Sequence, residues 1–157
     1  MSFLVNPGFE RHSTGGVGWF ANNLANSLGY NDSSISPLAR TGDRVLVMRA
    51  SETGASIAQD FIAHQANVNP TVRSLSAFGW FRSETDETVA GALAIWDLNV
   101  SDRAVTAPFE VGPTWTLVTC TLDTLSPPSK IEIWRARVEV YLNTIDKDLL
   151  VDSLNAF

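Results

Sequence analysis

The sequence predicts an all-β fold: an antiparallel two-sheet β-sandwich in a single domain over residues 1–157. Residues with high strand propensity occur in short runs, and clusters of turn-forming residues separate these runs. Apolar and polar residues alternate within several runs, and no helical period is sustained. Strands joined by loops without intervening helices are typical of a sandwich rather than of an α/β fold.

In the first half of the chain, three runs read as strands. Residues 45–50 form an apolar run that ends before Gly54, and residues 56–62 form the next run. The run at residues 73–82 follows an Asn-Pro turn. Residues 29–40 have the least regular pattern, so we expect a long surface loop there.

In the second half, Gly and Pro mark the strand ends. The polar segment 83–87 predicts a hairpin-like tip, Gly112-Pro113 predicts a turn, and Pro127-Pro128 stops the chain again. The strands expected in this half are, in chain order, residues 88–98, 109–111, 114–122, 131–142 and 149–156.

Two of the runs have unusual polar sides. Every second residue of the 131–142 run is apolar and predicts a core-facing side, and the 73–82 run alternates in the same way. Their opposite sides mix aromatic residues with charged and small polar ones, which suits neither a dry core nor an ordinary solvent surface. We therefore predict a ligand-facing sheet. The residues on these sides are Ser74, Ser76, Phe78, Trp80, Arg82, Arg135, Arg137, Glu139 and Tyr141.

Composition and charge exclude several classes of function. Apolar residues make up 45% of the chain and charged residues 18%, as in globular proteins. The net charge of −6 and the absence of a basic stripe argue against binding of nucleic acid or of an anionic membrane surface. No apolar stretch approaches the roughly 18 residues of a membrane span. The single cysteine, Cys120, rules out an internal disulfide and reads as a small buried residue.

The opening residues 1–8 have neither a positively charged segment nor a long apolar stretch, so we expect no signal peptide. Two origins fit this expectation. The chain is either a complete protein made in the cytoplasm or a module taken from a longer secreted protein.

Both ends of the chain carry short motifs. Residues 4–10 read Leu-Val-Asn-Pro-Gly-Phe-Glu and are followed by Gly18-Trp19. Residues 149–154 read Leu-Leu-Val-Asp-Ser-Leu, with an aspartate among apolar residues. Further motifs lie between them, at residues 41–47 (TGDRVLV), 56–61 (SIAQDF), 75–82 (LSAFGWFR) and 113–116 (PTWT).

In this order, the motifs resemble those of carbohydrate-binding modules of the family 4/9/22 type, which are jelly-roll sandwiches of the galactose-binding-like superfamily. The resemblance covers essentially the whole chain and implies a jelly roll. It does not fix the ligand, because the same fold also serves in adhesion and in particle assembly.

The resemblance also implies one structural calcium ion that joins Glu10 to Asp152, with a loop contribution from Asp43. Calcium takes six to eight oxygen ligands, which two carboxylates and nearby loop carbonyls could supply. The ion would hold the two ends of the chain together and take no part in catalysis. In the alternative interpretation, Glu10 and Asp152 cap turns or accept hydrogen bonds from the backbone.

Aromatic residues are the candidates for a sugar platform, because a pyranose ring presents apolar C–H faces while polar side chains bond its hydroxyl groups. Core or rim packing is the alternative for each of them. The predicted ligand-binding residues are Trp80, Arg82, Trp96, Arg135, Glu139 and Tyr141. Two further tryptophans, Trp19 and Trp115, match positions that are usually buried in the family, and we expect them in the core.

No catalytic motif is present. The chain has no Gly-x-Ser-x-Gly elbow and no His-x-x-x-His spacing, so we expect it not to be an enzyme.

Two functional hypotheses remain open. The first is a structural or adhesion protein of a phage-type particle, such as a capsid decoration or tail protein. It would sit on the virion surface with capsid or tail proteins as partners, possible glycan affinity and possible trimer formation. The second is an extracellular polysaccharide-binding module from a secreted polysaccharide-degrading enzyme.

Overall fold

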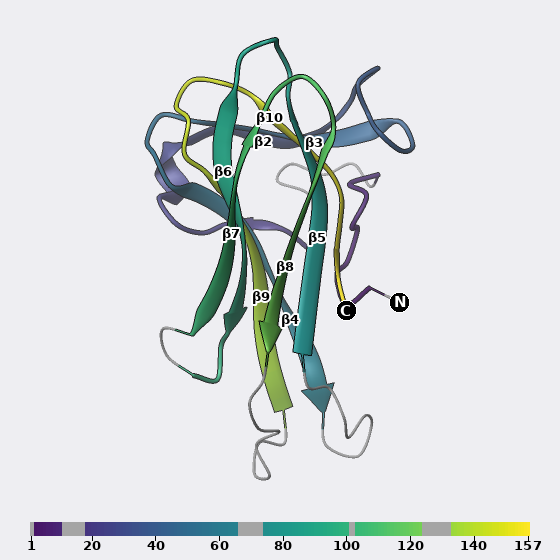
Figure 1. The fold of residues 1–157 in the computed structure, drawn as a ribbon, viewed down its shortest axis with the longest axis vertical. Helices are drawn as coiled ribbons and strands as arrows, with labels where there is room; N and C mark the ends of the chain where they lie inside the picture. The colour runs from purple at the N-terminus through teal and green to yellow at the C-terminus, as the bar shows by residue number, and fades with distance from the viewer. Residues whose placement is uncertain (1, 11–17, 66–73, 101–102, 124–132) are drawn as a thin grey trace.

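The computed structural model describes residues 2–10, 18–65, 74–100, 103–123 and 133–157. Two five-stranded antiparallel sheets pack face to face, as Figure 1 shows from the β7–β8 edge, and the predicted two-sheet sandwich is confirmed. In spatial order, sheet A contains β1 (Phe20–Ala21), β4 (Ala55–Gln65), β9 (Ile133–Leu142), β6 (Val89–Asp97) and β7 (Ala104–Val111). Sheet B contains β2 (Leu28–Ile35), β3 (Arg44–Ala50), β10 (Leu149–Ala156), β5 (Ser74–Ser83) and β8 (Thr116–Asp123).

Helix is nearly absent from the described part of the chain. One 3-10 turn, η1 (Ala25–Ser27), precedes β2. None of the helical structure in the described ranges is long and apolar enough to cross a membrane.

Alternate strand residues fill the space between the sheets, as the period-two pattern predicts. Leu46 and Met48 of β3, Phe81 of β5 and Val138 and Val140 of β9 are all buried. They belong to one cluster that both sheets build. The polar sides of β5 and β9 therefore face outward, away from this core.

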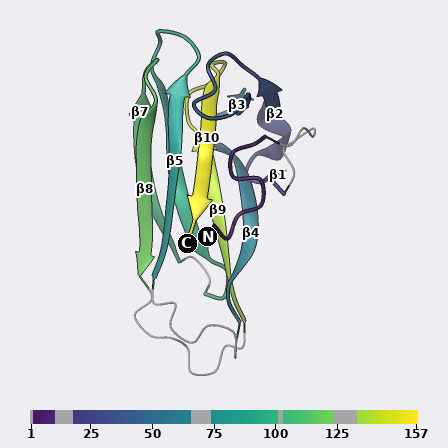
Figure 2. The same cartoon turned by 90° about the vertical axis from the view of Figure 1, so that its right-hand side faces the viewer.

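The two ends of the chain lie side by side, as Figure 2 shows. The amide of Phe3 donates to the carbonyl of Ala156 at 2.8 Å, and the amide of Leu154 donates to the carbonyl of Pro7 at 2.8 Å. Phe9 is fully buried, and its ring lies 5.5 Å from that of Trp19. The opening segment thus extends along β10 and completes the core.

Two strands differ from the sequence-based expectation. The prediction of a loop at residues 29–40 is wrong, because β2 occupies most of this segment and pairs with β3 along the edge of sheet B. Main-chain hydrogen bonds hold this edge strand, so its side chains need not alternate. β7 starts at Ala104 rather than at residue 109. It tolerates Pro108 because β7 is the other sheet's edge strand, where a missing amide is least harmful.

Of the three further residues that we expected in the core, two are buried there and one is not. Trp19 and Cys120 are buried as expected, and burial raises the pKa of the Cys120 thiol to about 11. The expectation for Trp115 is wrong. Its half-buried ring packs on the outer side of sheet B, against a small cluster of Val45, Val47 and Leu150.

The close packing of sheet A predicts a clear cost for one added methyl group. A Cβ on Gly91 of β6 would clash with the carbonyl oxygen of Tyr141 and would lie 2.6 Å from Cζ of Phe109. We expect Gly91→Ala to lower the free energy of unfolding by about 1–3 kcal/mol, the usual cost of overpacking. Urea denaturation measures this loss. Gly112→Ala is the control, because a Cβ there has nothing within 4 Å and the midpoint should barely change.

Candidate functional site

The candidate site is the outer face of sheet A, where β4, β9 and β6 lie side by side. Its floor is low in the middle, because Ala58 of β4 and Ala94 of β6 flank Glu139 of β9. Larger side chains stand around this floor. We define the sheet A face by the outward residues Asp60, Ile62, Trp96, Leu98, Arg135, Arg137, Glu139 and Tyr141.

Glu139 is the centre of a polar network on this face. Its side chain is buried, with the residue only 1% exposed, although its strand position points away from the core. The carboxylate accepts hydrogen bonds from the Asn22 amide at 2.6 Å and from the Ser56 hydroxyl. Burial and the neighbouring Glu139 carboxylate raise the pKa of Tyr141, so its phenol stays protonated. Glu139 therefore fixes neighbouring side chains rather than facing solvent.

Trp96 stands on the adjacent strand, directly opposite Arg137 in the pairing of β6 with β9. Its indole ring is half-buried. The indole N–H is buried and lies beside the Tyr141 hydroxyl without a hydrogen bond of ordinary geometry. Trp96 and Tyr141 thus form the aromatic part of the sheet A face.

The cation beside Trp96 is already paired. Nε of Arg137 lies 2.6 Å from Oδ1 of Asp60, and its second nitrogen lies 3.1 Å from Oδ2. This fork-to-carboxylate geometry is the strong form of an ion pair. The Phe20 ring, 5.3 Å from the guanidinium carbon, supports Arg137 from the β1 side.

A pocket of about 330 Å³ continues the face toward the end of the sheet where β9 begins. It is lined by Asp60, Phe61, Ile62, Leu98 and Arg135. Its volume is at the lower end of the range for small-molecule sites, about 300–1,000 Å³. Ile62 and Leu98 are exposed, so the pocket offers apolar surface next to a cation.

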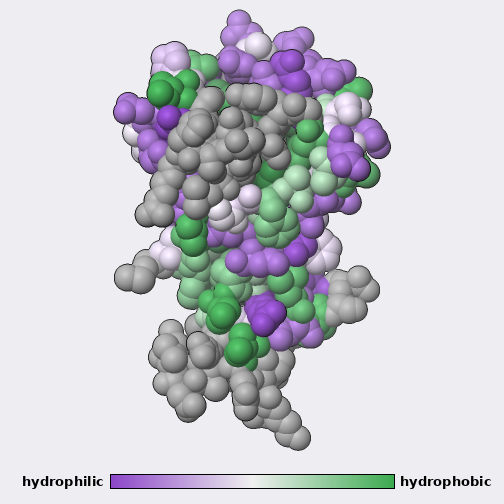
Figure 3. Space-filling view, turned by 180° about the vertical axis from the view of Figure 1, so that it is seen from behind, coloured by the Kyte–Doolittle hydropathy of each residue, from purple (hydrophilic) through white to green (hydrophobic). Residues whose placement is uncertain are grey.

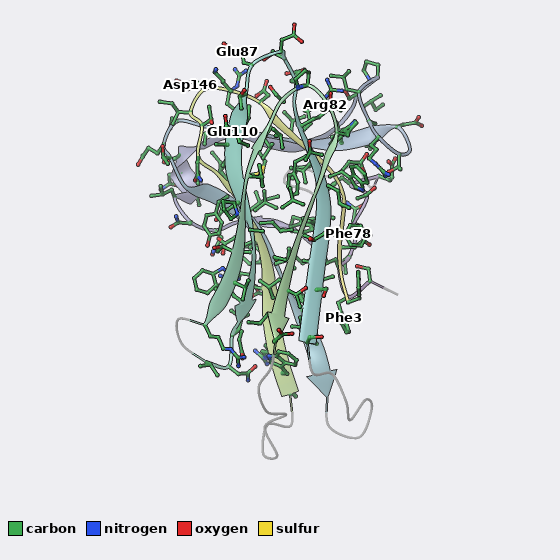
Figure 4. The ribbon with its side chains drawn as sticks, viewed as in Figure 1. Phe3, Phe78, Arg82, Glu87, Glu110 and Asp146 are labelled. Atoms are coloured by element: carbon green, nitrogen blue, oxygen red, sulfur yellow. The ribbon has the colours of Figure 1, made fainter. Side chains whose placement is uncertain are left out.

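The predicted ligand-binding residues do not share one surface. Four of them, Trp96, Arg135, Glu139 and Tyr141, lie on the sheet A face, whereas Trp80 and Arg82 lie on the outer face of sheet B. The expectation of one shared face is wrong because alternation tells which side of its own strand a residue occupies, and β5 and β9 belong to different sheets. Figure 4 shows the two sides of the sandwich, with Arg82 and Phe78 on the β5 side and Glu110 on the β7 side.

On sheet B, the two predicted residues are engaged by neighbours. The Arg40 guanidinium lies 3.8 Å from the centre of the Trp80 ring and covers it. Arg82 donates to the carbonyl of Ser83 at 3.0 Å and lies 5.9 Å above the ring of Trp115. Neither side chain is therefore an open platform.

The three residues predicted to bind calcium surround one loop. Oδ2 of Asp152 accepts the amides of Arg40 and Thr41, both at 2.9 Å. The carboxylate of Glu10 accepts the amides of Asp43 at 3.2 Å and Arg44 at 3.4 Å. The structure thus brings Glu10 and Asp152 to the same loop, in the geometry of the alternative interpretation, with backbone amides as their partners.

The donor set of a calcium site is not assembled by these contacts. No group of three or more His, Cys, Asp and Glu side chains that could hold a metal lies within the described ranges. Gly42, with φ of +65°, lets Glu10 approach the loop, because any Cβ there would collide with the Glu10 carboxylate. Glu10 and Asp152 fit the role of loop anchors, Asp43 lies in the loop that they hold, and the calcium ion stays a prediction.

Several residues of the site were missed from the sequence. Asp60 and Ile62 lie on β4, and Leu98 directly follows β6; the outward positions of these segments carried no visible pattern. Arg137 was visible, because it alternates with Arg135 and Glu139 along β9. Asn22, which reaches Glu139 across 117 positions of sequence, had no local signal at all.

Comparison with protein-family models and with curated proteins finds no match. Solved structures do match. The module TmCBM61, in complex with beta-1,4-galactotriose, is 16% identical, with a TM-score of 0.66, over 100% of this chain and 98% of that one. The CBM22-1 xylan-binding domain of Paenibacillus barcinonensis Xyn10C is 15% identical, with a TM-score of 0.63, over 95% and 89% of the two chains.

Proteins of other kinds share the architecture. A cyclase from Fischerella sp. TAU is 13% identical, with a TM-score of 0.70, over 99% of this chain and 96% of that one. The tailspike protein 4 of bacteriophage CBA120 is also 13% identical, with a TM-score of 0.63, over 99% of this chain but only 21% of that one. At such low identity these matches show the fold alone. The chain therefore has the two-sheet jelly-roll fold of carbohydrate-binding modules.

Proposed function

We propose that the chain is a non-catalytic glycan-binding protein, and that the glycan lies along the sheet A face. The observation that carries this proposal is the placement of Trp96 and Tyr141 on neighbouring strands, beside the Arg137–Asp60 pair and the pocket. An aromatic ring can pack on the C–H face of a sugar, while fixed polar groups bond its hydroxyls.

The similar structures support this class of ligand. One contains bound galactotriose and another is a xylan-binding domain. A shared fold does not by itself transfer a ligand, so the proposal depends on the side chains of the sheet A face.

The acidic groups on this face favour binding over catalysis. Asp60 is held by two nitrogens of Arg137, and Glu139 is buried under its hydrogen-bond donors. A general acid or base must reach the proton that it transfers, and these carboxylates are already engaged. The Fischerella cyclase has the same fold, so the absence of catalysis is inferred from these contacts and not from the architecture.

The tryptophans on the two sheets give a direct test. We expect Trp96→Ala to weaken binding to a galactan or xylan by about fivefold or more, since contact between an aromatic ring and a sugar ring contributes of the order of 1 kcal/mol or more. Isothermal titration calorimetry or affinity electrophoresis on polysaccharide gels measures the change. Trp80→Ala is the matched control, because Trp80 lies on sheet B under Arg40.

Two results would contradict the proposal. Equal loss of binding in both variants, with both folded by circular dichroism, would separate binding from the sheet A face. Failure of the unmodified protein to bind any glycan on an array would remove the proposed function altogether.

We further propose that this glycan-binding protein works on the surface of a phage-type particle. The tailspike match supports this setting, because almost the whole chain aligns with one part of a phage protein. Val5 and Phe157 also leave apolar surface near the joined chain ends, where 49% and 53% of these residues are exposed. Capsid or tail proteins would then be the partners, and a trimer is one form that assembly could take. A secreted, extracellular module is the alternative setting.

Gene order distinguishes the two settings. We expect neighbouring genes to encode a major capsid protein or tail proteins, and light scattering after size-exclusion chromatography to report the oligomer. A neighbouring polysaccharide-degrading enzyme, or fusion to one, would assign the chain to the extracellular setting instead.

The Asp152 anchor and the calcium prediction are tested together. Asp152→Ala leaves two backbone amides without their acceptor, and we expect a loss of about 2–4 kcal/mol in the free energy of unfolding. Calcium binding predicts in addition that EDTA lowers the melting temperature of the unmodified protein by several degrees. An identical melting temperature with EDTA and with added calcium would reject the ion and leave the carboxylates as loop anchors.

A further inference from the structure

We propose that the pocket at the end of the sheet A face selects a sugar that carries a carboxylate, such as a uronic acid, and that Arg135 binds this carboxylate. The inference rests on the proposed function and names the class of glycan. It comes from the charge and lining of the pocket in this chain.

The pocket combines apolar walls with one cation. Phe61 is a core residue at its base, and Ile62 and Leu98 stand at its sides with 50% and 39% exposure. Ile62 is the direct cross-strand partner of Arg135. A sugar ring resting on the apolar side chains would bring a C5 carboxylate within reach of the guanidinium.

Arg135 is distinguished by having no partner for its charge. No hydrogen bond or ion pair of its guanidinium occurs among the described residues, whereas the adjacent Arg137 is held by Asp60. Other described cations are engaged as well: Arg40 with Trp80, Arg49 with Asp148, Arg103 with Asp97 and Lys147 with Glu87. A pocket cation with no partner in the described part of a chain of net charge −6 is therefore a feature of this site.

Asp60 lines the same pocket but does not cancel the charge of Arg135. Both of its oxygens are turned to Arg137, with contacts of 2.6 and 3.1 Å. Among the described residues, the charge of Arg135 therefore stays without a counterion. A neutral sugar would leave this charge without a counterion, whereas a carboxylate would pair with it in the fork geometry that guanidinium favours.

The backbone around Arg135 is fixed before any ligand arrives. The Asn99 side chain accepts the Arg135 amide at 2.7 Å and donates to the Ile133 carbonyl at 3.2 Å. The Leu98 amide donates to the Arg135 carbonyl at 3.0 Å. These bonds hold the end of β6 against β9, so the apolar wall and the arginine keep their relative positions, which lowers the entropic cost of binding.

A matched pair of polymers tests the proposal on the intact protein. Polygalacturonate carries a carboxylate on each ring, and its carboxyl-reduced derivative has the same rings and linkages without charge. We expect the intact chain to bind polygalacturonate at least about tenfold more tightly than the reduced polymer at low salt, as hydrogen bonds to a charged group allow. Added NaCl should reduce the difference.

The variants Arg135→Gln and Lys147→Gln separate a local contact from a general effect of charge. Both remove one positive charge, but Lys147 lies beyond the opposite end of β9. We expect Arg135→Gln to abolish the preference for polygalacturonate and Lys147→Gln to keep it, with melting temperatures confirming that both are folded. Arg135→Lys should recover part of the preference, because it restores charge without the fork.

The outcomes distinguish this inference from the proposed function. Equal binding of both polymers, or a preference that Arg135→Gln leaves intact, overturns the role of Arg135. Binding of neutral galactan or xylan through Trp96 in that same case would leave the proposed function in place. No binding of any polymer, acidic or neutral, overturns both.

Discussion

The burial of the Glu139 carboxylate on an outward-facing position is the constraint on which the candidate site depends. A carboxylate removed from water must be compensated by hydrogen-bond donors, and here two donors come from distant parts of the chain. Asn22 follows the edge strand β1, and Ser56 lies on β4. Their hydrogen bonds to Glu139 connect the edge of sheet A to its centre, on the face that also carries Tyr141 and Trp96.

The outer faces of the two sheets differ in what covers them. On sheet B, residues around Leu38 and Ala39 cover Val45, Val47 and Leu150, and Trp115 locks this cover by donating to the Leu38 carbonyl at 3.0 Å. Sheet A instead has small alanines and paired charges. Figure 3, seen from behind, shows hydrophobic and hydrophilic residues intermixed across the middle of the molecule. On sheet A, aromatic groups thus lie next to a pocket.

The sequence was sufficient to predict the sandwich and the inward sides of β5 and β9. In these strands, the alternation of apolar and polar residues shows directly which residues meet the core. It was insufficient for β2, whose residues show no apolar–polar alternation although the strand pairs with β3 along its length. It also did not show that β5 and β9 belong to different sheets, since the assignment of a strand to a sheet depends on contacts far apart in sequence. Glu139 shows a further limit: its position on β9 was predictable, but its burial depends on Asn22, a residue with no local pattern to mark it.

The hydrogen bond between Phe3 and Ala156 has a consequence for the place of this fold in larger proteins. When entry and exit points of a domain coincide, the domain can be inserted into a surface loop of a host protein without separating the two sides of that loop. The same proximity makes circular permutation feasible, with a short linker joining the old ends and new ends opened in an exposed turn. The geometry therefore suits a unit that can be moved between unrelated chains while its sheets stay intact.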